Sequence, residues 1–240
     1  MLKKVSIIAA LLCMAASFNA RAQIVDVIGG YIFAGESSGV AATIQAYGQD
    51  GFGDTYARSD FAFKKEPFSL ATAYLEAART LVFWKNTKFK DIGIHAEFNG
   101  YLNMDNCNWL FGLDYTLPLK DLVKVSLLYK TFNGGAFATV PVQLSVLWDM
   151  KNLFSVKGLE FKGTAKIWGE DTKYWYYDED PLAHAPAYFK ITTTPQIWYS
   201  VGQFFGWDGL SIGGELNLNY NYLGMSGLFV YPFAAVRISF

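Results

Sequence analysis

LFVYPFAAVRISF, residues 228–240, ends the chain and decides its fold. Counting back from Phe240, every second residue as far as Leu228 is apolar, whereas the positions between them include Ser239 and Arg237. Successive side chains of a β-strand point to opposite faces, so the stretch is a strand with one wholly apolar face. A closing strand of this kind, placed after an export signal and many similar strands, is typical of an outer-membrane β-barrel.

The first residues have the pattern of an export signal. Lys3-Lys4 supplies positive charge, residues 5–16 are mostly apolar, and Ala20-Arg21-Ala22 is an A-x-A cleavage site. We therefore predict a signal peptide over residues 1–22 and a single mature barrel domain over residues 23–240. The predicted location is the outer membrane of a Gram-negative bacterium.

The composition excludes several classes of protein. Hydrophobic residues make up 52% of the chain and charged residues 17%, yet no stretch after the signal approaches the roughly 20 apolar residues of a membrane helix. Only helices and closed barrels satisfy their backbone groups in lipid, which leaves a barrel or a soluble β-rich protein. A formal net charge of −1 gives no basis for a nucleic-acid partner. Cys107 is the one cysteine beyond the signal, so we expect no disulfide, metal or other cofactor.

Alternation with a period of two runs through the whole mature chain and predicts about twelve strands. The fold class is therefore all-β, a transmembrane antiparallel up-and-down β-barrel. The predicted strands cover residues 25–34, 39–49, 54–63, 70–83, 91–100, 107–117, 123–132, 140–148, 159–168, 187–201, 210–223 and 228–240. Ten strands are the alternative, because residues 149–158 and 202–209 are long for connections on the inner side of the membrane. A soluble β-sandwich would instead place the polar faces in water and the apolar faces in a core.

Polar faces of these strands define the candidate site. In residues 210–222, Leu216 belongs to an apolar face that we assign to lipid, and Asn217 to a polar face that we assign to the lumen. The same reasoning gives a set of lumen residues expected to contact a permeating solute: Tyr74, Glu76, Arg79, His95, Glu97, Lys124, Gln143, Lys162, Gln196, Trp198, Glu215, Asn217 and Arg237.

Other roles for these residues stay open. Charged lumen residues of barrels often pair with one another across strands, and Trp198 lies near a predicted strand end, where aromatic residues mark the membrane interface. Glu76 and Arg79 are three positions apart, so both face the lumen only if a β-bulge occurs near Ala77-Ala78.

Several short motifs carry a resemblance to a known family: YLEAAR at 74–79, FWK at 83–85, HAEFNG at 95–100, PQIWY at 195–199 and GGE at 213–215. With these motifs the chain resembles an uncharacterised outer-membrane family related to the Tsx-type nucleoside-specific channel-forming proteins. The resemblance implies a twelve-stranded monomeric barrel with a narrow pore that passes nucleosides. It covers residues 39–240, but the nucleoside-contacting aromatic residues of the better-characterised channels have no one-to-one match here.

The function predicted from these features is a passive channel for small polar solutes, with nucleosides as the expected permeants. About twelve strands leave a lumen between the filled interior of eight-stranded barrels and the open channel of sixteen-stranded ones. The expected partners are the permeant, outer-membrane lipid and the barrel-assembly machinery. A structural or adhesive barrel is the first alternative. An enzyme of lipid metabolism is the second and weaker one, because His95 and His184 are the only histidines and no G-x-S-x-G elbow occurs.

Overall fold

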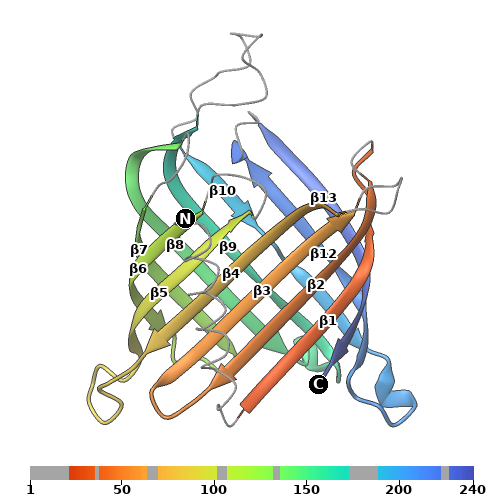
Figure 1. Ribbon diagram of the computed structural model, residues 1–240. Coiled ribbons are helices and arrows are strands. Elements are labelled where there is room, and N and C mark those ends of the chain that lie inside the picture. Colours follow the sequence, from red (N-terminus) through yellow and green to blue (C-terminus); the bar gives the residue numbers. More distant parts are fainter. Residues whose placement is uncertain are drawn as a thin grey trace, which may run out of the picture.

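The chain forms a closed antiparallel β-barrel (Figure 1) in the computed structural model, which describes residues 22–35, 38–63, 70–101, 107–131, 136–172, 189–222 and 227–240. The strands are β1 Ala22–Ile32, β2 Gly39–Gln49, β3 Gly53–Phe63, β4 Leu70–Leu81, β5 Ile92–Tyr101, β6 Asn108–Thr116, β7 Leu122–Lys130, β8 Ala136–Lys151, β9 Leu159–Thr172, β10 Lys190–Thr193, β11 Gln196–Ser200, β12 Leu210–Tyr220 and β13 Leu228–Ser239. The strands follow one another around the sheet, and β13 pairs with β1 to close it. The all-β barrel prediction is therefore confirmed.

The barrel wall contains twelve strand positions, because β10 and β11 occupy one position between them. Both strands pair with β9 on one side and with β12 on the other. The break falls at Thr194-Pro195, where proline has no N–H to donate to the sheet. Hydrogen bonds from Thr194 N–H to the Thr164 carbonyl (2.8 Å) and from Leu216 N–H to the Pro195 carbonyl (2.9 Å) keep the neighbouring strands attached across it.

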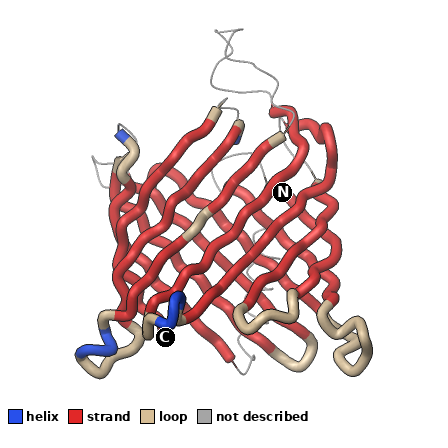
Figure 2. The backbone as a smooth tube through the Cα atoms, turned by 180° about the vertical axis from the view of Figure 1, so that it is seen from behind, coloured by secondary structure: helices blue, strands red, loops and turns tan. Residues whose placement is uncertain are grey.

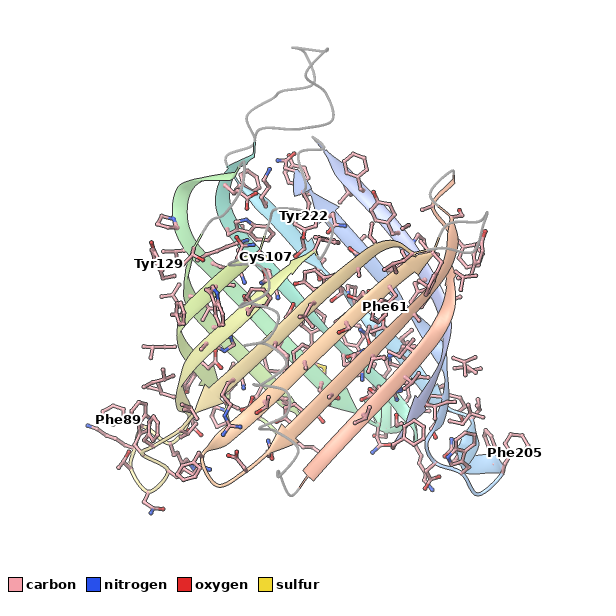
Figure 3. All side chains as sticks on the ribbon, in the orientation of Figure 1. Phe61, Phe89, Cys107, Tyr129, Phe205 and Tyr222 are labelled. Atoms are coloured by element: carbon pink, nitrogen blue, oxygen red, sulfur yellow. The ribbon has the colours of Figure 1, made fainter. Side chains whose placement is uncertain are left out.

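The two faces of the wall follow the predicted alternation. On β12, Ser211 and Glu215 are buried, whereas Ile212 and Leu216 are exposed to 49% and 44% on the outer face. Tyr129 on β7 likewise points away from the barrel (Figure 3). An apolar outer face with a polar inner face is the arrangement that a membrane barrel requires.

Connections at the end of the barrel that holds the C-terminus (Figure 2) range from the turn at residues 50–52 to the loop at residues 82–91. The two long connections that suggested ten strands contain the 3₁₀ turns Leu153–Ser155 and Gly202–Phe204. The ten-strand alternative is wrong, because the wall contains twelve strand positions. Most of the longest predicted connection, residues 169–186, and the predicted signal peptide up to residue 21 lie outside the described residues. Within the described part of the chain, no helix has the length and apolar character needed to cross a membrane.

Candidate functional site

The candidate site is the lumen, into which the inner faces of all strands project polar side chains (Figure 3). With one exception, the residues predicted to face the lumen lie on these inner faces. They come from eight strands: Tyr74 and Glu76 (β4), His95 and Glu97 (β5), Lys124 (β7), Gln143 (β8), Lys162 (β9), Gln196 and Trp198 (β11), Glu215 and Asn217 (β12), and Arg237 (β13).

Arg79 is the exception, and its assignment to the lumen is wrong. The pairing of β3 with β4 continues without a register shift through Ala77 and Ala78, so the bulge that would turn Arg79 inward does not form. Arg79 therefore shares the outer face with Ala77. Its guanidinium forms an ion pair of 2.7 Å with Asp50 in the β2–β3 turn and a hydrogen bond of 2.6 Å to Thr55.

At mid-height an ion pair crosses the lumen between almost opposite walls. Lys166 Nζ on β9 lies 2.7 Å from Glu76 on β4 and 3.2 Å from Glu97 on β5. In the ring of twelve positions, β4 and β9 are five places apart, close to the maximum of six. The lysine and the two glutamates therefore form a bridge of side chains across the interior.

A second bridge lies beside the first. Arg58 on β3 binds Asp60 on its own strand (2.8 Å) and Glu215 on β12 (3.0 Å). Gln196 donates a hydrogen bond of 2.6 Å to Glu215 and accepts one of 3.0 Å from the indole of Trp198. We call the six charged residues of these two bridges, Arg58, Asp60, Glu76, Glu97, Lys166 and Glu215, the mid-lumen network.

Further ion pairs line the lumen between this network and the C-terminal end. Lys124 binds Asp54 (2.8 Å) and lies 3.7 Å from Asp114. Lys162 binds Asp26 at 2.9 Å. Arg237 pairs with Glu160, and its guanidinium lies 4.9 Å from the ring centre of Trp198. The expectation that lumen charges pair with one another therefore describes most of this site.

His95 is held between two carboxylates. Its Nδ1 atom is 2.9 Å from Asp114, and its Nε2 atom is 3.4 Å from Glu97. A histidine that activates a serine must direct one ring nitrogen at the hydroxyl. Since both nitrogens of His95 face carboxylates, the geometry supports an ion-pair role for this residue.

A cavity of about 510 Å³ occupies the half of the lumen nearest the C-terminus. Its walls reach the turn residues Asn152, Gly158 and Asp208 at that end, and its inner limit is formed by members of the mid-lumen network. Toward the other end the lumen is packed, with Leu110, Leu128, Gln143, Trp168 and Lys190 all at most 5% exposed. The cavity is therefore a vestibule that opens at the C-terminal end and stops at the network.

The packed half holds the remaining predicted residues in internal contacts. Tyr74 donates to Glu76 (2.8 Å), Gln143 donates to Ser145 (2.9 Å), and Asn217 accepts from Asn219 (2.8 Å). Trp168 is covered by the ammonium of Lys130, which lies 3.9 Å from its ring centre.

Sequence reasoning omitted some central members of the site. Arg58, Asp60 and Lys166 were not among the predicted contact residues. Arg58 and Asp60 nevertheless alternate in phase with Asp54 on β3, and Lys166 alternates in phase with the predicted Lys162 on β9. That phase was the signal that could have found them.

Comparison with known families gives a match. A family model described as "Domain of unknown function (DUF5020)" matches residues 31–240. The chain belongs to this family. The match covers nearly the whole barrel of the DUF5020 chain, including every strand that contributes to the mid-lumen network. No curated protein matches the chain. The relationship of this DUF5020 protein to nucleoside channels therefore stays a prediction.

Proposed function

We propose that this DUF5020 protein is an outer-membrane barrel that lets small polar solutes pass through a narrow lumen, and that the mid-lumen network is its constriction. The observation that carries the proposal is the vestibule of about 510 Å³, which leads from the C-terminal end to ion pairs that cross the lumen. A solute that leaves the vestibule must displace these side chains and then the packed side chains beyond them, including Leu110, Leu128 and Trp168. The exposed apolar outer face supports placement in a membrane.

Nucleosides are the permeants that the family resemblance suggests. Tyr56 and Gln196 line the vestibule and offer an aromatic ring and an amide to a base and a ribose. Two other lumen rings, Trp168 and Trp198, are already covered by Lys130 and Arg237. Nucleosides therefore enter the proposal as one class of solute to be tested.

Single-channel recording in planar bilayers tests the channel itself. The double variant Lys166→Ala, Glu76→Gln removes one cation and one anion, so the net charge stays unchanged while the bridge across the lumen is cut. We expect small current steps for the wild-type protein and larger steps for the double variant. Adenosine and uridine should produce transient block if they enter the lumen, because a permeant must bind weakly enough to leave.

The matched control removes an ion pair outside the lumen. Arg79→Gln combined with Asp50→Asn also deletes one cation and one anion, and it should leave the conductance unchanged. If folded wild-type protein and the Lys166 double variant both fail to conduct, the channel proposal is wrong.

A further inference from the structure

Opposite charges stand side by side on one wall of the constriction. Arg58 and Glu76 are register partners on the adjacent strands β3 and β4, and both face the lumen. Yet the cross-strand contacts of each go to other groups: Arg58 binds Glu215 on β12, and Glu76 binds Lys166 on β9. The β3–β4 wall thus presents a cation and an anion as neighbours. Arg58 is shared between Asp60 on its own strand and Glu215 from β12, whereas Glu76 is neutralised by Lys166 from β9.

Opening the constriction separates these pairs. When Lys166 and Glu215 withdraw toward their own strands, Arg58 loses one of its two carboxylates and Glu76 loses its ammonium. Glu76, Glu97 and Glu215 are each less than a tenth exposed, and a buried charge without a partner is costly. A solute therefore passes most readily if it replaces both partners that the β3–β4 wall has lost, Glu215 at Arg58 and Lys166 at Glu76, while it occupies the constriction.

We propose that the preferred permeants are small zwitterions, molecules that carry one ammonium and one carboxylate, such as free amino acids. This inference rests on the proposed channel function. The carboxylate of the solute replaces Glu215 at Arg58, and its ammonium replaces Lys166 at Glu76 and Glu97. Because both groups belong to one small molecule, they match a cation and an anion on neighbouring strands.

Other classes of solute replace fewer of the ion-pair partners that Arg58 and Glu76 lose. A monovalent anion replaces Glu215 only, and a monovalent cation replaces Lys166 only, so each leaves one buried pair broken. A neutral solute, including a nucleoside or a sugar, breaks both pairs and restores neither charge. Electrostatic replacement therefore ranks zwitterions above neutral molecules of equal size.

Swelling of proteoliposomes compares the two classes directly. Alanine, a zwitterion at pH 7, and lactamide, its neutral constitutional isomer, have the same atoms and nearly the same size. The rate measured in protein-free vesicles is subtracted for each solute, because neutral molecules cross lipid more easily. We expect alanine to enter faster than lactamide by roughly threefold or more, the ratio that a modest difference in binding produces.

A variant with unchanged net charge tests whether the preference for zwitterions arises at Arg58. Arg58→Gln with Glu215→Gln removes the carboxylate site without changing the net charge, and the ratio of alanine to lactamide rates should fall toward one. The Arg79→Gln, Asp50→Asn control should keep the wild-type ratio. Heat-modifiable mobility shows that each variant is folded before its rates are compared.

The outcomes separate the two proposals. Equal rates for alanine and lactamide in the wild-type protein overturn the zwitterion inference and leave the channel standing. A wild-type ratio retained in the folded Arg58 variant also overturns it, since the preference then arises elsewhere. If neither solute enters faster than in protein-free vesicles, the channel proposal fails and the inference fails with it.

Discussion

Lys166 is the residue on which the mid-lumen network depends most. Its ammonium is shared by Glu76 and Glu97, which are 8% and 4% exposed. Lys166→Met leaves two buried carboxylates without their cation, and breaking a buried pair from one side costs about 3–5 kcal/mol. We expect the free energy of unfolding to fall by that amount in urea titrations in lipid vesicles.

Lys120 provides the control for this prediction. It lies exposed in the turn between β6 and β7, so Lys120→Met should change the free energy of unfolding by less than about 1 kcal/mol. Adding Glu76→Gln and Glu97→Gln to Lys166→Met should recover part of the loss, because the unpaired charges are removed. Equal destabilisation by the two lysine variants would show that the bridge contributes nothing.

Asp50, in the turn between β2 and β3, should make stability depend on pH. Its slight burial acts to raise the pKa, but hydrogen bonds from the N–H groups of Phe52 and Gly53 and the ion pair with Arg79 lower the pKa of Asp50 below its ordinary value. A carboxyl whose pKa is lower in the folded state stabilises the protein above its unfolded pKa and loses that effect as the pH falls through the folded value. Below about pH 4, wild-type protein should therefore lose more stability than Asp50→Asn. Unfolding midpoints measured from pH about 6 to about 3 check this, and parallel curves for the two proteins contradict it.

Period-two alternation was sufficient to place nearly all the lumen residues, because it fixes the face of each side chain. It failed at Arg79, where the lumen assignment needed a bulge that the continuous β3–β4 pairing excludes. The partners of the charges were beyond prediction. Lys166 meets Glu76 only because the barrel closes with a particular register and diameter, and neither quantity follows from a single strand.

Strand β12 offers the sharpest test of which side chains face outward and which face the lumen. Leu216 lies on the outer face and Asn217 faces the lumen. Leu216→Arg should lower the free energy of unfolding by about 2–4 kcal/mol if the residue lies near the middle of the bilayer. Asn217→Arg places its charge in the lumen and should cost less. Reversible denaturation in lipid vesicles measures both, and equal costs would refute the faces assigned to β12.

Phe240, the residue after β13, extends the pairing between β13 and β1 that closes the barrel. Phe240 donates a hydrogen bond of 3.0 Å to the Val25 carbonyl and accepts one of 3.3 Å from the Val25 N–H. Deleting Phe240 removes these bonds and an apolar side chain that is 75% exposed. We expect a smaller fraction of protein to reach the heat-modifiable, membrane-inserted form. If the truncated chain assembles as well as the wild-type protein, the other residue pairs between β1 and β13 are sufficient to close the barrel, and the role proposed for Phe240 is wrong.

Strand existence was predictable from sequence, but interruptions within strands were not. The predicted strand 187–201 is two strands, because Pro195 cannot donate a backbone hydrogen bond. Strand β8 starts at Ala136, earlier than predicted, and its register against β9 shifts between Ala138 and Gln143. Such shifts depend on the neighbouring strand, which the local pattern does not contain.

For the whole molecule, the sequence indicated the barrel class because an apolar chain with a predicted export signal and no stretch long enough for a membrane helix has few other options. It also indicated a constricted lumen. The division of that lumen into an open vestibule and a packed half was not predictable, because it depends on how side chains from distant strands fill a common interior.

The cross-lumen pairs also bear on how the barrel closes. Arg58 and Glu215 are 157 residues apart, and Lys162 and Asp26 are 136 apart, so each pair joins an early strand to a late one. Contacts this distant in sequence form only after the intervening chain has been ordered. A sheet that has not yet closed therefore lacks these cross-lumen contacts, although Arg58 can still bind Asp60 on its own strand. These ion pairs form only when the first and last strands meet and the barrel closes. The same side chains that narrow the finished lumen therefore favour the closed barrel over its open precursors.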